Sequence, residues 1–174
     1  MLYKIAITGP ESTGKSTLAK ALAKYFNGNV VDEYAREYID QLGRPYKEGD
    51  LLEIAKGQIE KEDEVTKKAD GYLFCDTELT VIDIWSQEKF GRTHSWITEQ
   101  LLKRAYHLYL LCDIDLKWQE DPQREDPYDR EHLLNLYRNS LDNRNIKYDM
   151  ISGQGEERIN NAVQIIEDLF EENL

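Results

Sequence analysis

A pattern that binds phosphate groups occurs near the start of the chain. Residues 9–16, GPESTGKS, match GxxxxGK[ST]. Gly9 and Gly14 allow backbone angles and close approaches that a Cβ atom would block, so successive N–H groups can face one concavity and hold phosphate oxygens. Lys15 is then expected to reach the terminal phosphates, and the Ser16 hydroxyl to complete the shell of a Mg²⁺ ion. The pattern predicts an ATP and Mg²⁺ site formed by Gly9, Glu11, Ser12, Thr13, Gly14, Lys15, Ser16 and Thr17.

Two apolar runs end at an aspartate that could serve such a site. Asp76 follows the run 72–75, and the carboxyl end of a parallel strand lies at the edge of the sheet where ligands bind. We therefore expect Asp76 to act in catalysis at the metal or at the substrate; the alternative is that it caps the next helix. Asp113 follows the run 107–112 in the same way, but the sequence supports a role at the metal or the substrate less strongly for Asp113 than for Asp76.

A dense cluster of charges follows the second predicted strand, in residues 30–37, VVDEYARE. Glu33 and Arg36 are three residues apart, a spacing that brings them to one face of a starting helix. Glu33 could accept the proton of a substrate hydroxyl, and Arg36 could hold the substrate or a phosphate. A solvated ion pair is the equally weighted alternative, and Asp32 is a reserve candidate.

Residues 117–131, KWQEDPQREDPYDRE, form a polar segment between two predicted ordered elements. We name it the lid segment, because a nucleotide kinase closes a lid that carries a cation over the phosphates and excludes water. Arg124 and Arg130 are its candidate cations, Trp118 is a candidate substrate contact, and the alternative is a solvated mobile loop. Gly153, in the SGQG sequence after the last predicted strand, is expected beside the base of the nucleotide.

Short apolar runs alternate with stretches of helical period along the whole chain. This alternation predicts an α/β fold in one domain, residues 1–174, with a five-stranded parallel sheet and helices on both faces. Together with the phosphate-binding pattern at 9–16, it is typical of a three-layer P-loop NTPase fold. The expected strands are 2–8, 29–31, 72–75, 107–112 and 148–151; the expected helices start at Ser16, include 51–65 with Lys and Glu on the solvent face, and end the chain at 159–170.

The composition narrows the class of protein further. Among 174 residues, 22 Lys and Arg face 34 Asp and Glu, which gives a net charge of −12 and argues against nucleic acid as a partner. No apolar run reaches the roughly 20 residues of a membrane helix, and the N-terminus lacks the apolar segment of a secretory signal. Cys75 and Cys112 lie in apolar stretches and are expected to be free buried thiols, so we expect a cytoplasmic location and no membrane partner.

Several of these motifs together resemble a known family. GPESTGKSTL, EYAREY, FCDT, the lid sequence WQEDPQRE and the terminal SGQGEER are similar to the ribosylnicotinamide kinase domain of a bacterial bifunctional regulator of NAD biosynthesis, over about residues 3–170. The resemblance implies ATP-dependent phosphorylation of the 5′-hydroxyl of nicotinamide riboside. It implies ATP and Mg²⁺ roles for Lys15 and Ser16, and it matches Glu33, Arg36, Asp76 and Arg124 to the family's motifs. The DNA-binding and adenylyltransferase domains of that regulator have no counterpart in this sequence.

Other functions share the same motifs. A regulatory ATPase or nucleotide switch would use the phosphate loop to alter the binding of a partner, and its lid segment would form a partner surface. A kinase of another nucleoside or of a vitamin would differ only in its acceptor pocket. The oligomeric state is not predicted. The kinase is favoured because the chain shows no obvious exposed apolar run that a partner could cover.

Overall fold

The computed structural model describes residues 1–125 and 128–171. Its centre is a five-stranded sheet in the order β2-β3-β1-β4-β5, and every neighbouring pair of strands is parallel. The strands are β1 (Leu2–Thr8), β2 (Asn29–Val31), β3 (Gly71–Asp76), β4 (Leu108–Cys112) and β5 (Tyr148–Ile151). This arrangement confirms the predicted fold class.

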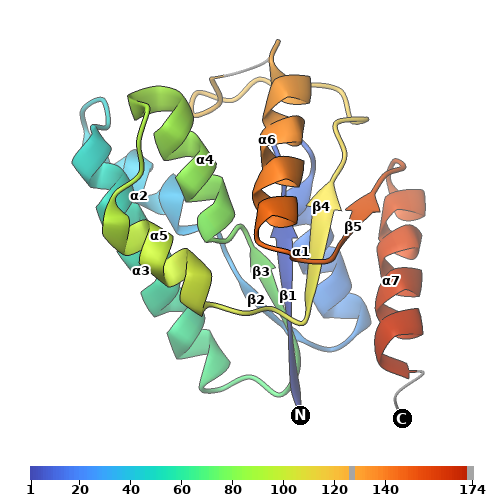
Figure 1. Ribbon diagram of the computed structural model, residues 1–174. Coiled ribbons are helices and arrows are strands. Elements are labelled where there is room, and N and C mark those ends of the chain that lie inside the picture. Colours follow the sequence, from blue (N-terminus) through green and yellow to red (C-terminus); the bar gives the residue numbers. More distant parts are fainter. Residues whose placement is uncertain (126–127, 172–174) are drawn as a thin grey trace.

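Helices cover both faces of the sheet (Figure 1). Those in the described ranges are α1 (Lys15–Tyr25), α2 (Tyr34–Leu42), α3 (Glu48–Thr66), α4 (Leu79–Phe90), α5 (Ser95–Lys103), α6 (Arg130–Asn143) and α7 (Glu156–Glu171). The helices α1 and α7 pack on one face, whereas α4 and α6 pack on the other, with α2, α3 and α5 beside them. None of these helices is long and apolar enough to cross a membrane.

The side chains of β1 show why its sequence is apolar throughout. Ile5 and Ile7 pack toward α1 and α7, and Ala6 between them packs toward α4 and α6. All three side chains are fully buried. Because helices cover both faces, the strand has no polar alternation, and burial of each isoleucine stabilises the fold by about 1.5–3 kcal/mol.

The predicted strands agree with the structure to within one residue at each end, and both cysteines are free and buried as predicted. Two predictions need correction. The lid segment is not irregular to residue 131, because α6 begins at Arg130; residues 126–127 lie outside the described part of the chain. The polar face of α3 is not all solvated, since Glu62 is 1% exposed. Its carboxylate is buried because Lys4, Arg104 and the Tyr106 hydroxyl bind it.

The strand order places the loop that follows β1 in the middle of the sheet's carboxyl edge. The chain leaves β1 for β2 and β3 on one side and later returns to β4 on the other side. A sheet that reverses its order in this way has a ligand-binding crevice at that point. The described parts of the lid segment lie at the same edge (Figure 1).

Candidate active site

A cavity of about 690 Å³ opens at this carboxyl edge. Its walls come from the phosphate loop, α1, α2, α4, the lid segment, α6 and α7. The lining includes Gly9, Pro10, Glu11, Ser12, Thr13, Gly14, Lys15, Ser16, Thr17, Glu33, Arg36, Arg44, Tyr46, Trp85, Glu88, Lys89, Gln119, Arg124, Glu125, Gln154, Gly155 and Arg158. The volume falls in the range of small-molecule sites.

The phosphate loop has the backbone that its glycines predict. Gly9 has φ +133°, and a Cβ atom there would lie 2.9 Å from the carbonyl oxygen of Cys112 in β4. Gly14 has φ +78° and stands at the N-cap of α1 without a side chain, so the first N–H groups of the helix remain open to an anion. Lys15 Nζ donates to the carbonyl oxygens of Gly9 and Pro10, at 2.8 Å each. The ammonium group is therefore held at the mouth of the loop.

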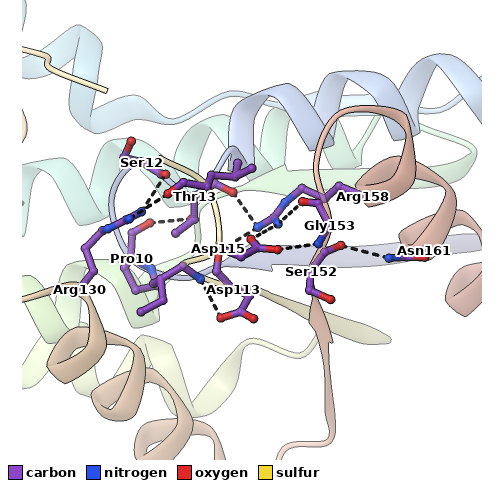
Figure 2. Close-up of polar contacts among 12 residues, drawn as sticks. Pro10, Ser12, Thr13, Asp113, Asp115, Arg130, Ser152, Gly153, Arg158 and Asn161 are labelled. Atoms are coloured by element: carbon purple, nitrogen blue, oxygen red, sulfur yellow. Dashed lines mark hydrogen bonds and ion pairs between the residues drawn. The ribbon is translucent and has the colours of Figure 1, made fainter. Parts of the chain in front are cut away.

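Arg158 of α7 is hydrogen-bonded to the backbone of the phosphate loop (Figure 2). Its Nη2 donates to the carbonyl oxygens of Thr13, at 2.9 Å, and Asp113, at 3.0 Å. Its Nη1 donates to Asp115 Oδ1 at 2.7 Å and to the Gly153 carbonyl oxygen at 3.0 Å. The side chain is 5% exposed, so this guanidinium joins the loop to the ends of β4 and β5.

Asp76 and Ser16 form a pair suited to a magnesium ion. Burial raises the pKa of Asp76, while the hydrogen bond from Ser16 and the charge of Lys15 oppose this rise. Asp76 is 2% exposed, and its Oδ1 has no hydrogen-bond partner within the described residues. A buried carboxylate oxygen beside a hydroxyl fits Mg²⁺, which keeps several waters and takes one or two protein ligands. Asp76 does not line the cavity itself; it reaches the cavity through Ser16.

Asp76 is not the cap of α4, the helix that follows it. Glu78 is the N-cap of α4, and its carboxylate accepts hydrogen bonds from the N–H of Thr80 at 2.8 Å and from the hydroxyl of Thr80 at 2.9 Å. Because Glu78 caps the helix, the Asp76 carboxylate remains available to the site.

Glu33 stands at the N-cap of α2 and lines the cavity. Burial raises its pKa; the charge of Lys15 opposes this rise, the charge of Asp76 adds to it, and the charge of Arg36 opposes it. The side chains of Glu33, Lys15 and Asp76 therefore share one electrostatic environment. A carboxylate with a raised pKa is a better proton acceptor than an ordinary glutamate, as a general base requires.

The alternative interpretation, an ion pair between Glu33 and Arg36, gives way to a contact of Arg36 with the lid segment. Glu33 precedes the helix, and Arg36 Nη1 instead donates to Asp121 Oδ2 at 2.9 Å. Of the other acids, Asp32 lies 3.8 Å from Lys20 Nζ, and its charge adds to the rise in the pKa of Asp76. Asp113 Oδ1 accepts the N–H of Ile114 at 2.8 Å, so this side chain stabilises a turn.

The two lid arginines occupy different positions. Arg124 lines the cavity, and its Nη1 donates to the Gln119 carbonyl oxygen at 2.6 Å. Arg130 instead donates to the carbonyl oxygens of Ser12, at 3.3 Å, and Leu116, at 2.8 Å. Its guanidinium lies 5.9 Å from the ring centre of Trp118. Arg130 therefore attaches the base of the lid segment to the phosphate loop, while Arg124 lines the cavity.

Two predicted contact residues lie outside the cavity lining. Trp118 packs near Arg130, and Gly153 donates its N–H to Asp115 Oδ2 at 2.6 Å. Their neighbours Gln119 and Gln154 line the cavity instead. The roles of Trp118 and Gly153 at the substrate and the nucleotide remain predictions.

The aromatic part of the cavity was not predicted from the sequence. Tyr46 and Trp85 line it, with ring centres 4.9 Å apart and an edge-to-face arrangement, and Trp85 Nε1 donates to Tyr46 Oη at 3.0 Å. Nothing in the local pattern marks either residue, because Tyr46 lies in a connection and Trp85 follows an ordinary helical period. Arg158 was also missed, although its place in SGQGEER, directly after a strand, was a usable signal.

The site has a strand, a glycine loop and a helix, which together hold a lysine at the carboxyl edge of the sheet. This arrangement defines a P-loop nucleotide-binding protein. The chain belongs to a family within this class. A family model described as AAA domain, AAA_28, matches residues 4–158.

Curated relatives carry a name connected with NAD. An alignment of 177 positions, which covers 97% of this chain, gives 27% identity to the trifunctional NAD biosynthesis/regulator protein NadR of Escherichia coli strain K12. An alignment of 152 positions, which covers 83% of this chain, gives 30% identity to the protein of the same name from Salmonella typhimurium. The chain spans 43% and 37% of these relatives. The predicted resemblance to this regulator is confirmed, although the relatives are named trifunctional rather than bifunctional.

Solved structures confirm the fold. The crystal structure of NadR protein in complex with NR matches with a TM-score of 0.81 and 19% identity, over 96% of this chain and 50% of that one. NadR in complex with NAD and AMP-PNP matches with a TM-score of 0.79 and 19% identity, over 96% and 49%. Thymidylate kinase from Ehrlichia chaffeensis matches with a TM-score of 0.64 and 16% identity, over 97% and 98%.

Proposed function

We propose that this protein is an ATP- and Mg²⁺-dependent kinase that phosphorylates the 5′-hydroxyl of nicotinamide riboside to give nicotinamide mononucleotide. The observation that carries the proposal is the convergence of Glu33 and Lys15 in one cavity, where a carboxylate with a raised pKa lies near a phosphate loop. The similarity to NadR, and the solved NadR structures with NR and with AMP-PNP, support this acceptor and this donor.

The phosphate loop would hold the nucleotide. The open N–H groups at the start of α1 would bind phosphate oxygens, and Lys15 would exchange its contacts with the Gly9 and Pro10 carbonyl oxygens for the terminal phosphates. Ser16 and Asp76 would hold Mg²⁺, which supplies positive charge that neutralises the phosphates. Arg158 would keep the loop in shape through its hydrogen bond to the Thr13 carbonyl oxygen.

Glu33 would orient the acceptor. Its carboxylate would accept the proton of the 5′-hydroxyl while the hydroxyl oxygen forms a bond to the γ-phosphorus and the bond between that phosphorus and the ADP oxygen breaks. The transition state is loose, so positioning of the hydroxyl contributes more than early removal of its proton. Arg124 would stabilise the charge on the transferred group, and the lid segment would exclude water.

A direct assay tests the proposal. The protein is incubated with Mg-ATP and, separately, nicotinamide riboside, thymidine, deoxyadenosine and no acceptor, while ADP and the phosphorylated product are quantified. We expect one phosphorylated nucleoside per ADP, with nicotinamide riboside as the best acceptor. Nucleotide hydrolysis without a phosphorylated product would overturn the kinase and favour a regulatory ATPase. Transfer to another nucleoside alone would overturn the assigned acceptor.

A further inference from the structure

One residue of the lid segment contacts both halves of the cavity. Glu125 Oε2 accepts a hydrogen bond from Tyr46 Oη at 3.0 Å and lies 2.8 Å from Lys89 Nζ. Its backbone N–H donates to Glu11 Oε2, in the phosphate loop, at 3.0 Å. Glu125 thus joins the phosphate loop to the opposite wall of the cavity through a single position in the lid.

The opposite wall has the chemistry of an aromatic binding surface. Tyr46 and Trp85, which we call the aromatic wall, present ring surface to the cavity and are tied together through the Tyr46 hydroxyl. A planar base that packs on this wall would rest directly against the residues that hold Glu125, because ring packing is favourable for flat aromatic groups. Tyr46 Oη therefore has two partners, Trp85 in the wall and Glu125 in the lid.

The position of Glu125 also affects the candidate cation of the lid. Arg124 is its immediate neighbour, and the Arg124 side chain is held by Gln119, which in turn donates its N–H to Ser12 Oγ at 2.9 Å. If Glu125 moves away from Tyr46, the adjoining peptide moves with it, and the position of Arg124 in the cavity wall changes. The aromatic wall and the catalytic cation are thereby connected through two adjacent residues.

We propose that Glu125 is a positioning residue which, through its contact with Tyr46, couples occupancy of the aromatic wall by the acceptor base to the placement of Arg124 over the phosphates. This inference rests on the proposed kinase function and explains why phosphate would be transferred to the acceptor rather than to water. With the base on the wall, the acceptor oxygen forms the new bond to the γ-phosphorus as the bond to ADP breaks. When the contact is lost, water takes the place of that oxygen and ATP is hydrolysed to ADP and phosphate.

The test compares product transfer with wasteful hydrolysis in matched variants. Glu125→Ala, Tyr46→Phe and the double variant are assayed with Mg-ATP and nicotinamide riboside, with nucleotide product and free phosphate measured in the same reactions. Glu120→Ala, which removes an exposed carboxylate of the same lid segment, is the control. We expect each single variant to lower the ratio of transfer to hydrolysis roughly tenfold, the size of a lost hydrogen bond to a charged group. The double variant should fall by less than the product of the two single losses, because each single change already removes the Tyr46–Glu125 contact.

A second measurement follows the lid without turnover. Trypsin cleavage after Arg124 should be faster in Glu125→Ala and Tyr46→Phe than in the unmodified chain and in Glu120→Ala. Nicotinamide riboside added with AMP-PNP should slow this cleavage only in proteins that keep the contact between Tyr46 and Glu125. The coupling would be overturned, and the kinase function retained, if the unmodified chain transfers phosphate while the single variants keep its ratio of transfer to hydrolysis. Additive losses of this ratio in the double variant would have the same meaning. An unmodified chain that phosphorylates no nucleoside would overturn both.

Discussion

The guanidinium of Arg158 lies 2.9 Å from the carbonyl oxygen of Thr13, although 145 residues separate the two along the chain. This contact matters because the phosphate loop binds its ligand with N–H groups, whose directions depend on where the neighbouring carbonyls are held. A helix at the end of the chain thus determines the shape of a loop near its beginning. The conformation of the phosphate loop therefore depends on the whole fold as well as on its own glycines.

Replacement of Arg158 should therefore damage nucleotide binding and stability together. Arg158→Met removes four hydrogen bonds and leaves Asp115 without its ion pair. We expect the free energy of unfolding to fall by about 2–3 kcal/mol, the size of a hydrogen bond to a charged group. Urea unfolding measures this loss, and titration with an ATP analogue measures the weaker binding.

Asn161→Ala is the matched control for Arg158→Met. Asn161 is an exposed residue of the same helix, and its Nδ2 donates to the Ser152 carbonyl oxygen at 3.1 Å. Its stability should change by less than about 0.5 kcal/mol, as is usual at exposed sites. Equal nucleotide affinity in Arg158→Met and Asn161→Ala would contradict a supporting role for Arg158.

Lys15→Ala should abolish ATP turnover and leave the fold intact. Its ammonium bonds two backbone carbonyls at the cavity, so its loss leaves no large hydrophobic void in the core. Circular dichroism checks the fold, and ADP release checks turnover. A folded Lys15→Ala variant with unchanged turnover would show that the phosphate loop does not bind ATP.

Glu33→Gln should slow transfer to the nucleoside about 10²–10⁴-fold, the usual contribution of a general base, while nucleotide binding changes little. Asp76→Asn should instead raise the Mg²⁺ concentration needed for half-maximal activity. Both variants are assayed across a Mg²⁺ titration with the acceptor present. If Glu33→Gln transfers at the normal rate and Asp76→Asn loses the acceptor step at saturating Mg²⁺, the two roles are reversed.

The raised pKa of Glu33 also predicts a dependence on pH. Burial favours the protonated form, so kcat/KM should fall as the pH drops through a pKa above 4.5, and Glu33→Gln should remove this limb. The folded state holds its proton more tightly than the unfolded chain, so the stability gained from this group is present below pH 4.5 and lost as the pH rises through the folded pKa. Glu33→Gln should consequently unfold at a higher urea concentration than the unmodified chain at pH 7. An equal or lower midpoint would contradict the burial of a charge at this position.

Arg124→Ala should lower kcat more than it weakens ATP binding, because Arg124 lines the cavity and, in the proposed mechanism, would stabilise the charge that develops during transfer. Steady-state kinetics and equilibrium titration with AMP-PNP separate the two effects. Arg130→Ala is the informative comparison, since Arg130 bonds the Ser12 carbonyl and should alter nucleotide binding as well. A loss confined to ATP affinity in Arg124→Ala would exclude a transition-state role.

Local patterns in the sequence determined the sheet and the phosphate loop. Two-sided burial makes the strands of a parallel sheet continuously apolar, and positive φ angles favour glycine, so runs such as 2–8 and the glycines at 9 and 14 can be recognised without a structure. The same logic placed Asp76 at the carboxyl edge. These features depend on residues that are neighbours along the chain or on the shared direction of the strands.

The partners of the charged and aromatic side chains were decided by tertiary packing alone. Arg36 pairs with Asp121 rather than Glu33, Arg158 reaches Thr13, and Tyr46 meets Glu125. Each contact joins residues that are distant along the chain, and helical spacing carries no information about which helix or loop packs opposite a given face. The sequence by itself therefore determined where phosphate would bind, whereas only the folded chain decided which side chains surround it.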